Sequence, residues 1–394
     1  MHSLLRRLAV VVIVLLCAAL AWFAFSPQLE VAFARNLLLY RAEKLWRATP
    51  SSPSATGTLM GVVRDEHGDA IAGATIVASD ADGRAFVTTS DGAGRYTLTV
   101  TRGALVPMAT KAGYDDATLQ LGPLKRSIYI EANAIGEGDF VLRRSPARTQ
   151  TADDSLKFFD DAIAHTDVTQ PADVRRRGFT FARAGATLNG SYVYEPMSEG
   201  RFPMLLLVLP CWTYPCSTLG WDVLSATLAS QGFVVVAFSP QRGIDFEADV
   251  DDVLKLIAHV KTHQLSAQGD ESRVALLAGS LTSIHLWRVA QLAPRDALQG
   301  VVALGGVSDL FLIRQRFESH ELLLEPPFAE PLSNALIGLG RPNLNPEFYV
   351  RYSPVYHLDA LTHVRIALIH GGGDKTVPFE QTPHFSAALT AHGI

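Results

Sequence analysis

The residues most able to do chemistry lie between Arg273 and Ser283, a stretch that reads RVALLAGSLTS. An apolar run ends at Ala278, Ser280 follows among small residues, and apolar residues then recur at helical spacing as far as Leu292. This order predicts a strand, a sharp turn and a helix, with the serine exposed at the turn. A serine hydroxyl is a weak nucleophile until a base takes its proton, so we also look for a histidine and for an acid that orients it.

A candidate acid lies near the C-terminal end of the sequence. The apolar run from Val364 to Ile369 predicts a strand, and the segment HGGGDKTVP that follows contains Asp374, the candidate acid. His370 opens the same segment, and we expect it to be structural. Asp309, which also follows a predicted strand, is the alternative acid.

Predicted strands and helices alternate from Arg177 onward, which indicates a mostly parallel sheet with helices on both faces. This order, the turn AGSLT and the segment HGGGDKTVP together resemble the α/β-hydrolases of the prolyl-oligopeptidase and dienelactone-hydrolase type. The resemblance covers about residues 177–394. The segment between Asp309 and Ser353, rich in Phe, Leu and Pro, resembles the cap above the pocket of these hydrolases.

The resemblance implies roles for three residues. Ser280 would attack the substrate, Asp374 would orient the histidine, and the backbone N–H of Leu281 would donate to the oxyanion. The family pattern at the turn is G-x-S-x-G. Ala278 is a mild departure from it, and Thr282 is a larger one because a β-branched residue stands where glycine is normal.

A second oxyanion donor is expected in the loop after the buried strand from Met204 to Leu209. Pro210 has no N–H to donate, which leaves the backbone N–H of Cys211 or of Trp212. Cys211 and Cys216 lie in the same loop. They either form a small-loop disulfide, as an exported protein allows, or are two unpaired thiols.

The histidine base is the partner that the sequence does not supply. The resemblance implies that it follows one more strand after the acid, but only one predicted helix precedes Ile394. His384 and His392 lie in that helix, and His285 lies on the helix after the turn. We expect none of them to reach Ser280. The preferred interpretation is a hydrolase domain truncated at its C-terminus, and a natural pseudo-hydrolase is the alternative.

The N-terminal residues predict a membrane segment. Leu8 to Phe25 is an uninterrupted apolar run preceded by Arg6 and Arg7, and it is long enough to cross a bilayer. We therefore expect a transmembrane anchor over residues 1–26, with the N-terminus in the cytoplasm and the rest of the chain exported. A cleaved signal peptide is the alternative.

Residues 27–57 predict a helix followed by a linker. Leu29, Phe33 and Leu37 recur at helical spacing with basic residues between them. This helix either lies on anionic lipid beside the membrane or packs on the hydrolase domain. The segment TPSSPSATGT then has the composition of a flexible linker.

Residues 58–144 predict a small β-sandwich, because short alternating runs are separated by Asp-Gly turn signals. The stretch GVVRDEHGDAIAGATIVASDADGRAFVTTSDGAGRYTLTV resembles the carboxypeptidase regulatory-like, or transthyretin-like, domain. That resemblance implies a non-catalytic module. Asp65, Asp82 and Asp91 are expected to form turns, with a calcium site as the alternative.

Residues 145–176 are polar and are interpreted as a connector, with one helical patch from Leu156 to Ile163. The whole chain carries a net charge of −5, which gives no electrostatic footprint for nucleic acid.

We therefore expect a membrane-anchored extracytoplasmic serine hydrolase that acts on an ester or peptide-like acyl bond. No metal or organic cofactor is implied. The alternative is a non-catalytic envelope protein that uses both domains for binding.

Overall fold

The computed structural model describes residues 19, 21–24, 26, 28–44, 55–121, 124–146, 148, 150–152, 155–159, 173–183, 186–209, 221–240, 245–322 and 329–394. Most of the expected anchor lies outside these residues, as do Cys211, Trp212 and Cys216, so the structure does not address the predicted anchor, disulfide or second oxyanion donor. Within the described ranges, no helix combines the length and the apolar character needed to cross a membrane.

An eight-stranded sheet forms the centre of the C-terminal part, in the order β13-β14-β15-β17-β16-β18-β19-β20. The three strands at one edge pair antiparallel, and those from β17 to β20 are parallel. The strands are β13 (Leu156–Phe159), β14 (Val174–Arg183), β15 (Ala186–Pro196), β16 (Phe202–Val208), β17 (Val234–Phe238), β18 (Gly269–Gly279), β19 (Gly300–Leu304) and β20 (Arg365–Ile369).

Strand β13 corrects one prediction. The helical patch expected from Leu156 starts instead as a strand that pairs antiparallel with β14, with Leu156 opposite Phe181. Helical spacing over a few residues is a weak signal, and the open edge of β14 offers hydrogen bonds that the isolated segment lacks.

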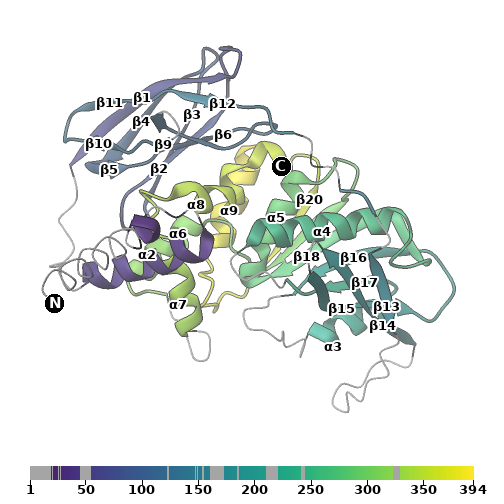
Figure 1. Ribbon diagram of the computed structural model, residues 1–394. Helices are drawn as coiled ribbons and strands as arrows, with labels where there is room; N and C mark the ends of the chain where they lie inside the picture. The colour runs from purple at the N-terminus through teal and green to yellow at the C-terminus, as the bar shows by residue number, and fades with distance from the viewer. Residues whose placement is uncertain are drawn as a thin grey trace, which may run out of the picture.

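Helices cover both faces of this sheet, as the alternation predicted (Figure 1). Helices α4 (Phe246–Lys261), α5 (Ser283–Leu292) and α9 (Gln381–Ala391) pack on one face, where Leu206 and Leu276 point. Helix α3 (Trp221–Ser230) packs on the other, against Leu205 and Leu207. Strands β16 and β17 are buried on both faces, which explains their nearly continuous apolar sequence.

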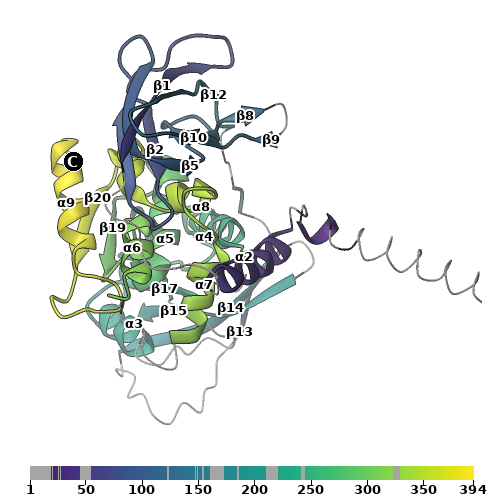
Figure 2. The ribbon, with the colours of Figure 1, turned by 90° about the vertical axis from the view of Figure 1, so that its left-hand side faces the viewer.

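The cap contains α6 (Leu310–Glu318), α7 (Ala329–Gly338) and α8 (Pro346–Arg351). The N-terminal helix α2 (Leu29–Lys44) lies beside α7, as both ribbon views show (Figures 1 and 2). Asn36 donates to the carbonyl oxygen of Gly338 at 2.9 Å, and Glu43 pairs with Arg341. Of the two placements considered for this helix, the structure shows the one that packs on the C-terminal domain.

The N-terminal β-sandwich is built from short strands around a core that includes Leu59, Ile76, Leu98 and Phe140. Its strands are β1 (Thr56–Asp65), β2 (Thr75–Ser79), β3 (Ala85–Thr89), β4 (Arg95–Thr101), β5 (Gly103–Leu105), β6 (Met108–Thr110), β7 (Ala117–Thr118), β8 (Gln120–Leu121), β9 (Leu124–Lys125), β10 (Ile128–Ile130), β11 (Ile135–Glu137) and β12 (Phe140–Leu142).

Two of the three aspartates that were expected to form turns in the sandwich do so. In the third turn the acceptor is Asp80, to which the N–H groups of Asp82 and Arg84 donate, and not Asp82. Asp65 accepts hydrogen bonds from the backbone N–H groups of His67 and Asp69, both at 2.9 Å. Asp91 accepts in the same way from Ala93 and Arg95. A carboxylate that accepts from the two N–H groups ahead of it closes an Asx turn, which is the role their sequence context predicts.

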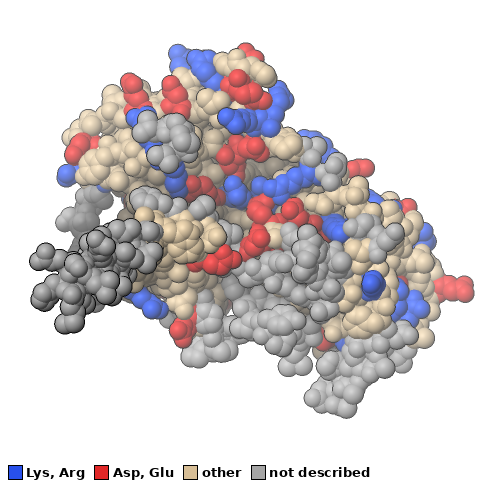
Figure 3. Space-filling model, viewed as in Figure 1, with Lys and Arg blue, Asp and Glu red and all other residues tan. Residues whose placement is uncertain are grey.

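The sandwich packs on the cap (Figure 1). Val77 and Met108 join an apolar cluster with Tyr349 and Val350 of α8. Along the same junction, Thr110 is hydrogen-bonded to His357 at 3.1 Å. Figure 3 shows acidic and basic side chains side by side where the two parts meet. These contacts join the sandwich to the elements that cover the sheet.

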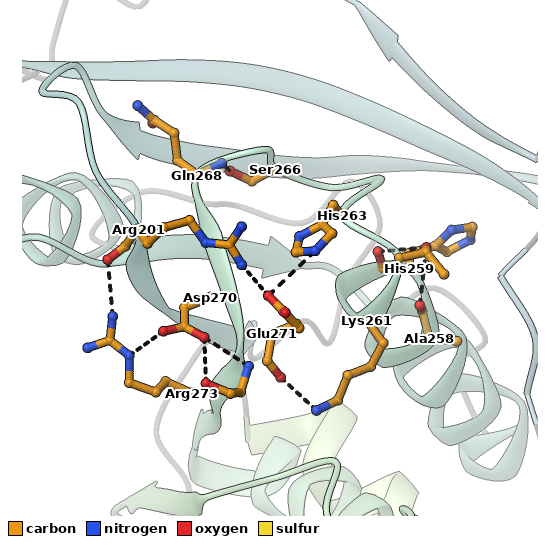
Figure 4. Close-up of polar contacts among 12 residues, drawn as sticks. Arg201, Ala258, His259, Lys261, His263, Ser266, Gln268, Asp270, Glu271 and Arg273 are labelled. Atoms are coloured by element: carbon orange, nitrogen blue, oxygen red, sulfur yellow. Dashed lines mark hydrogen bonds and ion pairs between the residues drawn. The ribbon is translucent and has the colours of Figure 1, made fainter.

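A cluster of charged and polar side chains lies where β18 begins, at the opposite end of the sheet from Ser280 (Figure 4). Asp270 accepts from Arg273 Nε at 2.6 Å and from the Ser272 hydroxyl at 2.6 Å. The neighbouring Glu271 pairs with Arg201. This cluster fixes the start of the strand that carries the candidate nucleophile.

Candidate active site

Ser280 lies at a strained turn between β18 and α5. A short 3-10 turn, Ser280–Thr282, connects Gly279 at the end of the strand to Ser283 at the start of the helix. Ser280 has a φ of +54°, in the left-handed region that non-glycine residues rarely adopt. Such a conformation costs of order 1–3 kcal/mol and is concentrated at functional sites. The predicted sharp turn between strand and helix is therefore present, with Ser280 half-buried at its apex.

The residue before the serine has no room for a side chain. A Cβ at Gly279 would lie 3.1 Å from Trp221 Cη2 and 3.2 Å from the carbonyl oxygen of Leu304. Ala278 is fully buried in the strand. Close packing of α3 and β19 around the turn thus explains why small residues precede Ser280.

Thr282, the larger departure from the family pattern, is accommodated by hydrogen bonds. Its buried hydroxyl lies 2.8 Å from the carbonyl oxygen of Gly279 and 3.2 Å from that of Val208. The threonine therefore ties the end of β16 to the elbow, which a glycine could not do.

Ser283 braces the elbow from the other side. Its hydroxyl oxygen accepts from the N–H of Val307 at 2.7 Å, and its hydroxyl lies 2.7 Å from the carbonyl oxygen of Ser280. The loop after β19 is held against the first turn of α5 by these contacts. The conformation of Ser280 is consequently fixed from both neighbouring strands.

Asp374 follows β20 in a compact loop. Its Oδ1 accepts from the backbone N–H groups of Thr376 at 2.9 Å and Val377 at 3.0 Å. Its side chain is 30% exposed, and His370 Nε2 lies 3.5 Å from Oδ2. A Cβ at Gly305, which has a φ of +52°, would lie 3.2 Å from Oδ2. Glycine at this position lets the loop after β19 pass beneath the carboxylate.

The register places Ser280 and Asp374 at the same end of the sheet, where the parallel strands have their carboxyl ends. Gly279 is paired with Leu304 on β19, and Leu304 is paired with Ile369 on β20. Adjacent strands lie about 4.8 Å apart, so β18 and β20 are about 10 Å apart. Ser280 and Asp374 therefore follow the carboxyl ends of two strands that are separated by one intervening strand.

His370, His384 and His392 have other partners, whereas His285, which lines the same cavity as Ser280, has no hydrogen bond to either ring nitrogen within the described residues. His370 bonds Thr382 Oγ1 at 2.7 Å and the carbonyl oxygen of Val377 at 3.0 Å, which gives it the structural role expected. His384 lies 3.6 Å from Asp309, and His392 lies 2.8 Å from Asp359. Among the described residues, no histidine is hydrogen-bonded to Ser280.

The alternative acid, Asp309, begins α6. Its Oδ1 accepts from the N–H groups of Phe311 at 2.9 Å and Leu312 at 3.4 Å, and its Oδ2 accepts from the hydroxyl of Tyr356 at 3.1 Å. Burial raises the pKa of Asp309 above its ordinary value. These contacts make Asp309 the N-cap of α6.

Ser280 opens into a cavity of about 270 Å³ between the sheet edge and the cap. Leu281, the first candidate oxyanion donor, also lines it, and its N–H belongs to the short 3-10 turn, Ser280–Thr282, that precedes α5. The apolar lining residues are Phe33, Pro240, Phe246, Leu281, Val307, Leu310, Ile313, Leu322, Leu332, Ala335, Leu336, Leu339, Phe348 and Val377.

Three of the lining residues that were not assigned to the site from sequence lie on helices distant from Ser280 in sequence or were given another role. Phe33 comes from α2, Asp249 from α4 and His285 from α5. Phe33 and Asp249 had no local motif, and His285 was interpreted as a packing residue. Only the folding of distant segments around one cavity associates them with Ser280.

The strand order and the strained serine between β18 and α5 define an α/β-hydrolase-like domain behind a β-sandwich. Residues 58–150 match the carboxypeptidase regulatory-like domain family. None of the curated proteins matches the sequence significantly.

Several solved structures are similar to this chain. Esterase B from Lactobacillus Rhamnosis is 16% identical, with a TM-score of 0.46, over 58% of this chain and 75% of its own. Carboxyl esterase 2 from Tuber melanosporum is 13% identical, with a TM-score of 0.47, over 58% of this chain and 76% of its own.

The acylaminoacyl peptidase of Pyrococcus horikoshii is 14% identical, with a TM-score of 0.44, over 79% of this chain. This chain spans less than half of that peptidase, 46% of its length.

Proposed function

We propose that this protein is a serine hydrolase that cleaves an ester or peptide-like acyl bond, with Ser280 as the nucleophile. The observation that carries the proposal is the left-handed backbone of Ser280 at the mouth of an apolar cavity, one strand away from Asp374. Backbone strain costs free energy and is concentrated at functional sites. Apolar cavities with a few polar groups are typical substrate sites.

In the proposed reaction, the Ser280 oxygen attacks the acyl carbon while a histidine takes the hydroxyl proton. The N–H of Leu281 donates to the oxyanion, with the N–H of Cys211 or Trp212 as the second donor. The histidine then protonates the leaving group, and an acyl-enzyme remains. Water, deprotonated by the same histidine, hydrolyses it and restores the serine. Asp374 orients the imidazole and stabilises its cation.

The proposal places the histidine in the gap between Ser280 and Asp374, carried by sequence beyond Ile394. The exposure of β20 supports this placement. Ile369, the last residue of the strand, is 57% exposed, whereas its partner Leu304 on β19 is half-buried and Phe238 at the end of β17 is buried. A further strand beside β20 would cover this edge and deliver the loop that follows it to Asp374.

We also propose that the protein is held in the membrane by residues 8–25, with the hydrolase domain outside the cytoplasm. The contact between this run and α2 supports the proposal. Arg35 donates to the carbonyl oxygens of Phe23 at 3.1 Å and Ala24 at 2.9 Å, so the end of the run is tied to α2. Because Phe33 of α2 lines the cavity, the proposed substrate site lies close to the bilayer surface.

A binding protein with a degenerate hydrolase domain is the second candidate. It is favoured by the partners of the histidines, since none of the described ones is bonded to Ser280.

A fluorophosphonate probe separates the two candidates, because it labels only a serine that a base activates. The measurement compares the chain ending at residue 394 with the chain extended through its natural downstream sequence. We expect labelling of the extended chain and its loss in Ser280→Ala. Ser386→Ala, at an exposed position of α9, is the matched control and should be labelled normally.

The absence of labelling in a folded, extended chain would overturn the hydrolase proposal and favour the binding protein. Labelling of the chain ending at residue 394 would show instead that the base lies within it.

A further inference from the structure

The cavity contains a polar pair that the proposed reaction does not use. His285 of α5 and Asp249 of α4 both line it, and their side chains are only 4% and 2% exposed. His285 Nε2 lies 3.7 Å from Asp249 Oδ2, which is beyond hydrogen-bond distance. Neither ring nitrogen of His285 has a hydrogen-bond partner in the part of the chain that the structure describes.

This arrangement is unusual because buried polar groups are nearly always paired. A neutral imidazole has one donor and one acceptor, and a carboxylate has several acceptor positions. Among the described residues, the ring lies against Phe246 at a centroid distance of 5.2 Å, and Phe348 packs behind that ring. The hydrogen-bonding capacity of His285 is therefore available to a molecule in the cavity.

The pair lies further along the cavity than the elbow. Leu281 lies in the 3-10 turn that leads into α5, and His285 lies in the first turn of that helix; both line the cavity. Ser280 and Leu281 line the same cavity. A chain whose carbonyl carbon lies at Ser280 and which follows α5 inward therefore reaches His285 and Asp249.

We propose that Asp249 and His285 form a subsite for a hydroxyl group carried by an otherwise apolar acyl chain. A hydroxyl can donate to Asp249 and accept from the imidazole N–H at the same time, and it brings no charge into the cavity. A carboxylate on the ligand would be repelled by Asp249. An ammonium would have to be desolvated in a mainly apolar space. This inference rests on the proposed function, because it takes the cavity as the acyl site.

Binding in the Ser280→Ala background tests the subsite without requiring any chemistry. The probes are methyl octanoate and its hydroxylated counterparts with the hydroxyl group at successive carbons, titrated by calorimetry. We expect one hydroxylated ester to bind about tenfold more tightly than methyl octanoate, which corresponds to about 1.4 kcal/mol. His285→Phe, which keeps an aromatic ring against Phe246, and Asp249→Asn should each remove most of this preference.

Phe348→Leu is the matched control, because it reshapes the apolar lining without touching the pair and should change both affinities in parallel. His285→Gln, which keeps hydrogen-bonding atoms, should retain part of the preference, and unfolding curves of all variants establish that they fold. A wild-type cavity without hydroxyl preference, or a preference that persists in His285→Phe, overturns the subsite.

The outcomes for the subsite and for the enzyme are distinguishable. Hydroxyl-dependent binding without phosphonate labelling would retain the subsite and reject the hydrolase. Phosphonate labelling without a preference for the hydroxylated ester would retain the hydrolase and reject the subsite.

Discussion

Phe33 of the N-terminal helix lies directly on Gly338, the last residue of α7. A Cβ at Gly338 would be only 2.0 Å from Phe33 Cε2, so a larger residue there would force the Phe33 ring, or α2 with it, to move. Because Phe33 also lines the cavity beside Ser280, this contact couples the position of α2 to the shape of the candidate substrate site.

The first prediction follows from this contact. Gly338→Ala should displace α2 and lower the free energy of unfolding by about 1–3 kcal/mol, since an added methyl group overpacks the contact. Trypsin should then cleave after Arg35 or Arg41 faster than in the wild type. Leu39→Ala, on the same helix but 59% exposed, should leave the cleavage rate unchanged. Equal cleavage of wild type and Gly338→Ala would show that α2 does not depend on this contact.

The second prediction concerns the hydroxyl of Thr282. Thr282→Val keeps the shape of the side chain but removes its hydrogen bonds to the carbonyl oxygens of Gly279 and Val208. We expect the free energy of unfolding to fall by about 1–2 kcal/mol, because the hydroxyl contributes about one buried hydrogen bond. Urea unfolding measures this change. Thr282→Ser, which keeps the hydroxyl, should lose less, and an equal loss in both variants would assign the effect to packing.

The third prediction uses the strain at Ser280. Ser280→Gly should be more stable than Ser280→Ala by about 1 kcal/mol, because glycine adopts a φ of +54° without steric cost. Thermal or urea unfolding of the two variants gives the difference directly, and neither variant has a nucleophile. If Ser280→Ala is as stable as Ser280→Gly, the turn is not strained in solution.

The fourth prediction is a pH dependence at the start of β18. Hydrogen bonds from Ser272 and from Arg273 lower the pKa of Asp270 from 3.8 to about 2. A carboxylate with a lowered pKa in the folded state stabilises the protein above its unfolded pKa, and this contribution is lost as pH falls from about 4 towards 2. Asp270→Asn should therefore be less stable than wild type at neutral pH, and the difference should shrink across that range.

Urea unfolding as a function of pH measures the Asp270 effect. Added salt should reduce it, because the partner Arg273 is half-exposed and the pair is screened. A difference that stays constant between pH values of about 5 and 2 would contradict the assignment.

Local sequence determined the parts of the site that depend on neighbouring residues. The small residues around Ser280 allow a left-handed turn between a strand and a helix, and the glycines before Asp374 allow a tight loop after β20. Both features could be predicted because their geometry is set within a few residues. The same holds for the turn-forming Asp65 and Asp91 of the sandwich, whose side chains bond to backbone groups just ahead of them.

Tertiary structure decided the features that join distant segments. The strand at Leu156 exists because β14 offers an open edge, and no short pattern could indicate that partner. The wall contributed by Phe33 and the pairing of Asp249 with His285 likewise depend on how α2, α4 and α5 pack around one cavity. Sequence therefore determined which residue could be the nucleophile and which the acid. The fold alone decided what surrounds them, because burial and contact are properties of the packed chain.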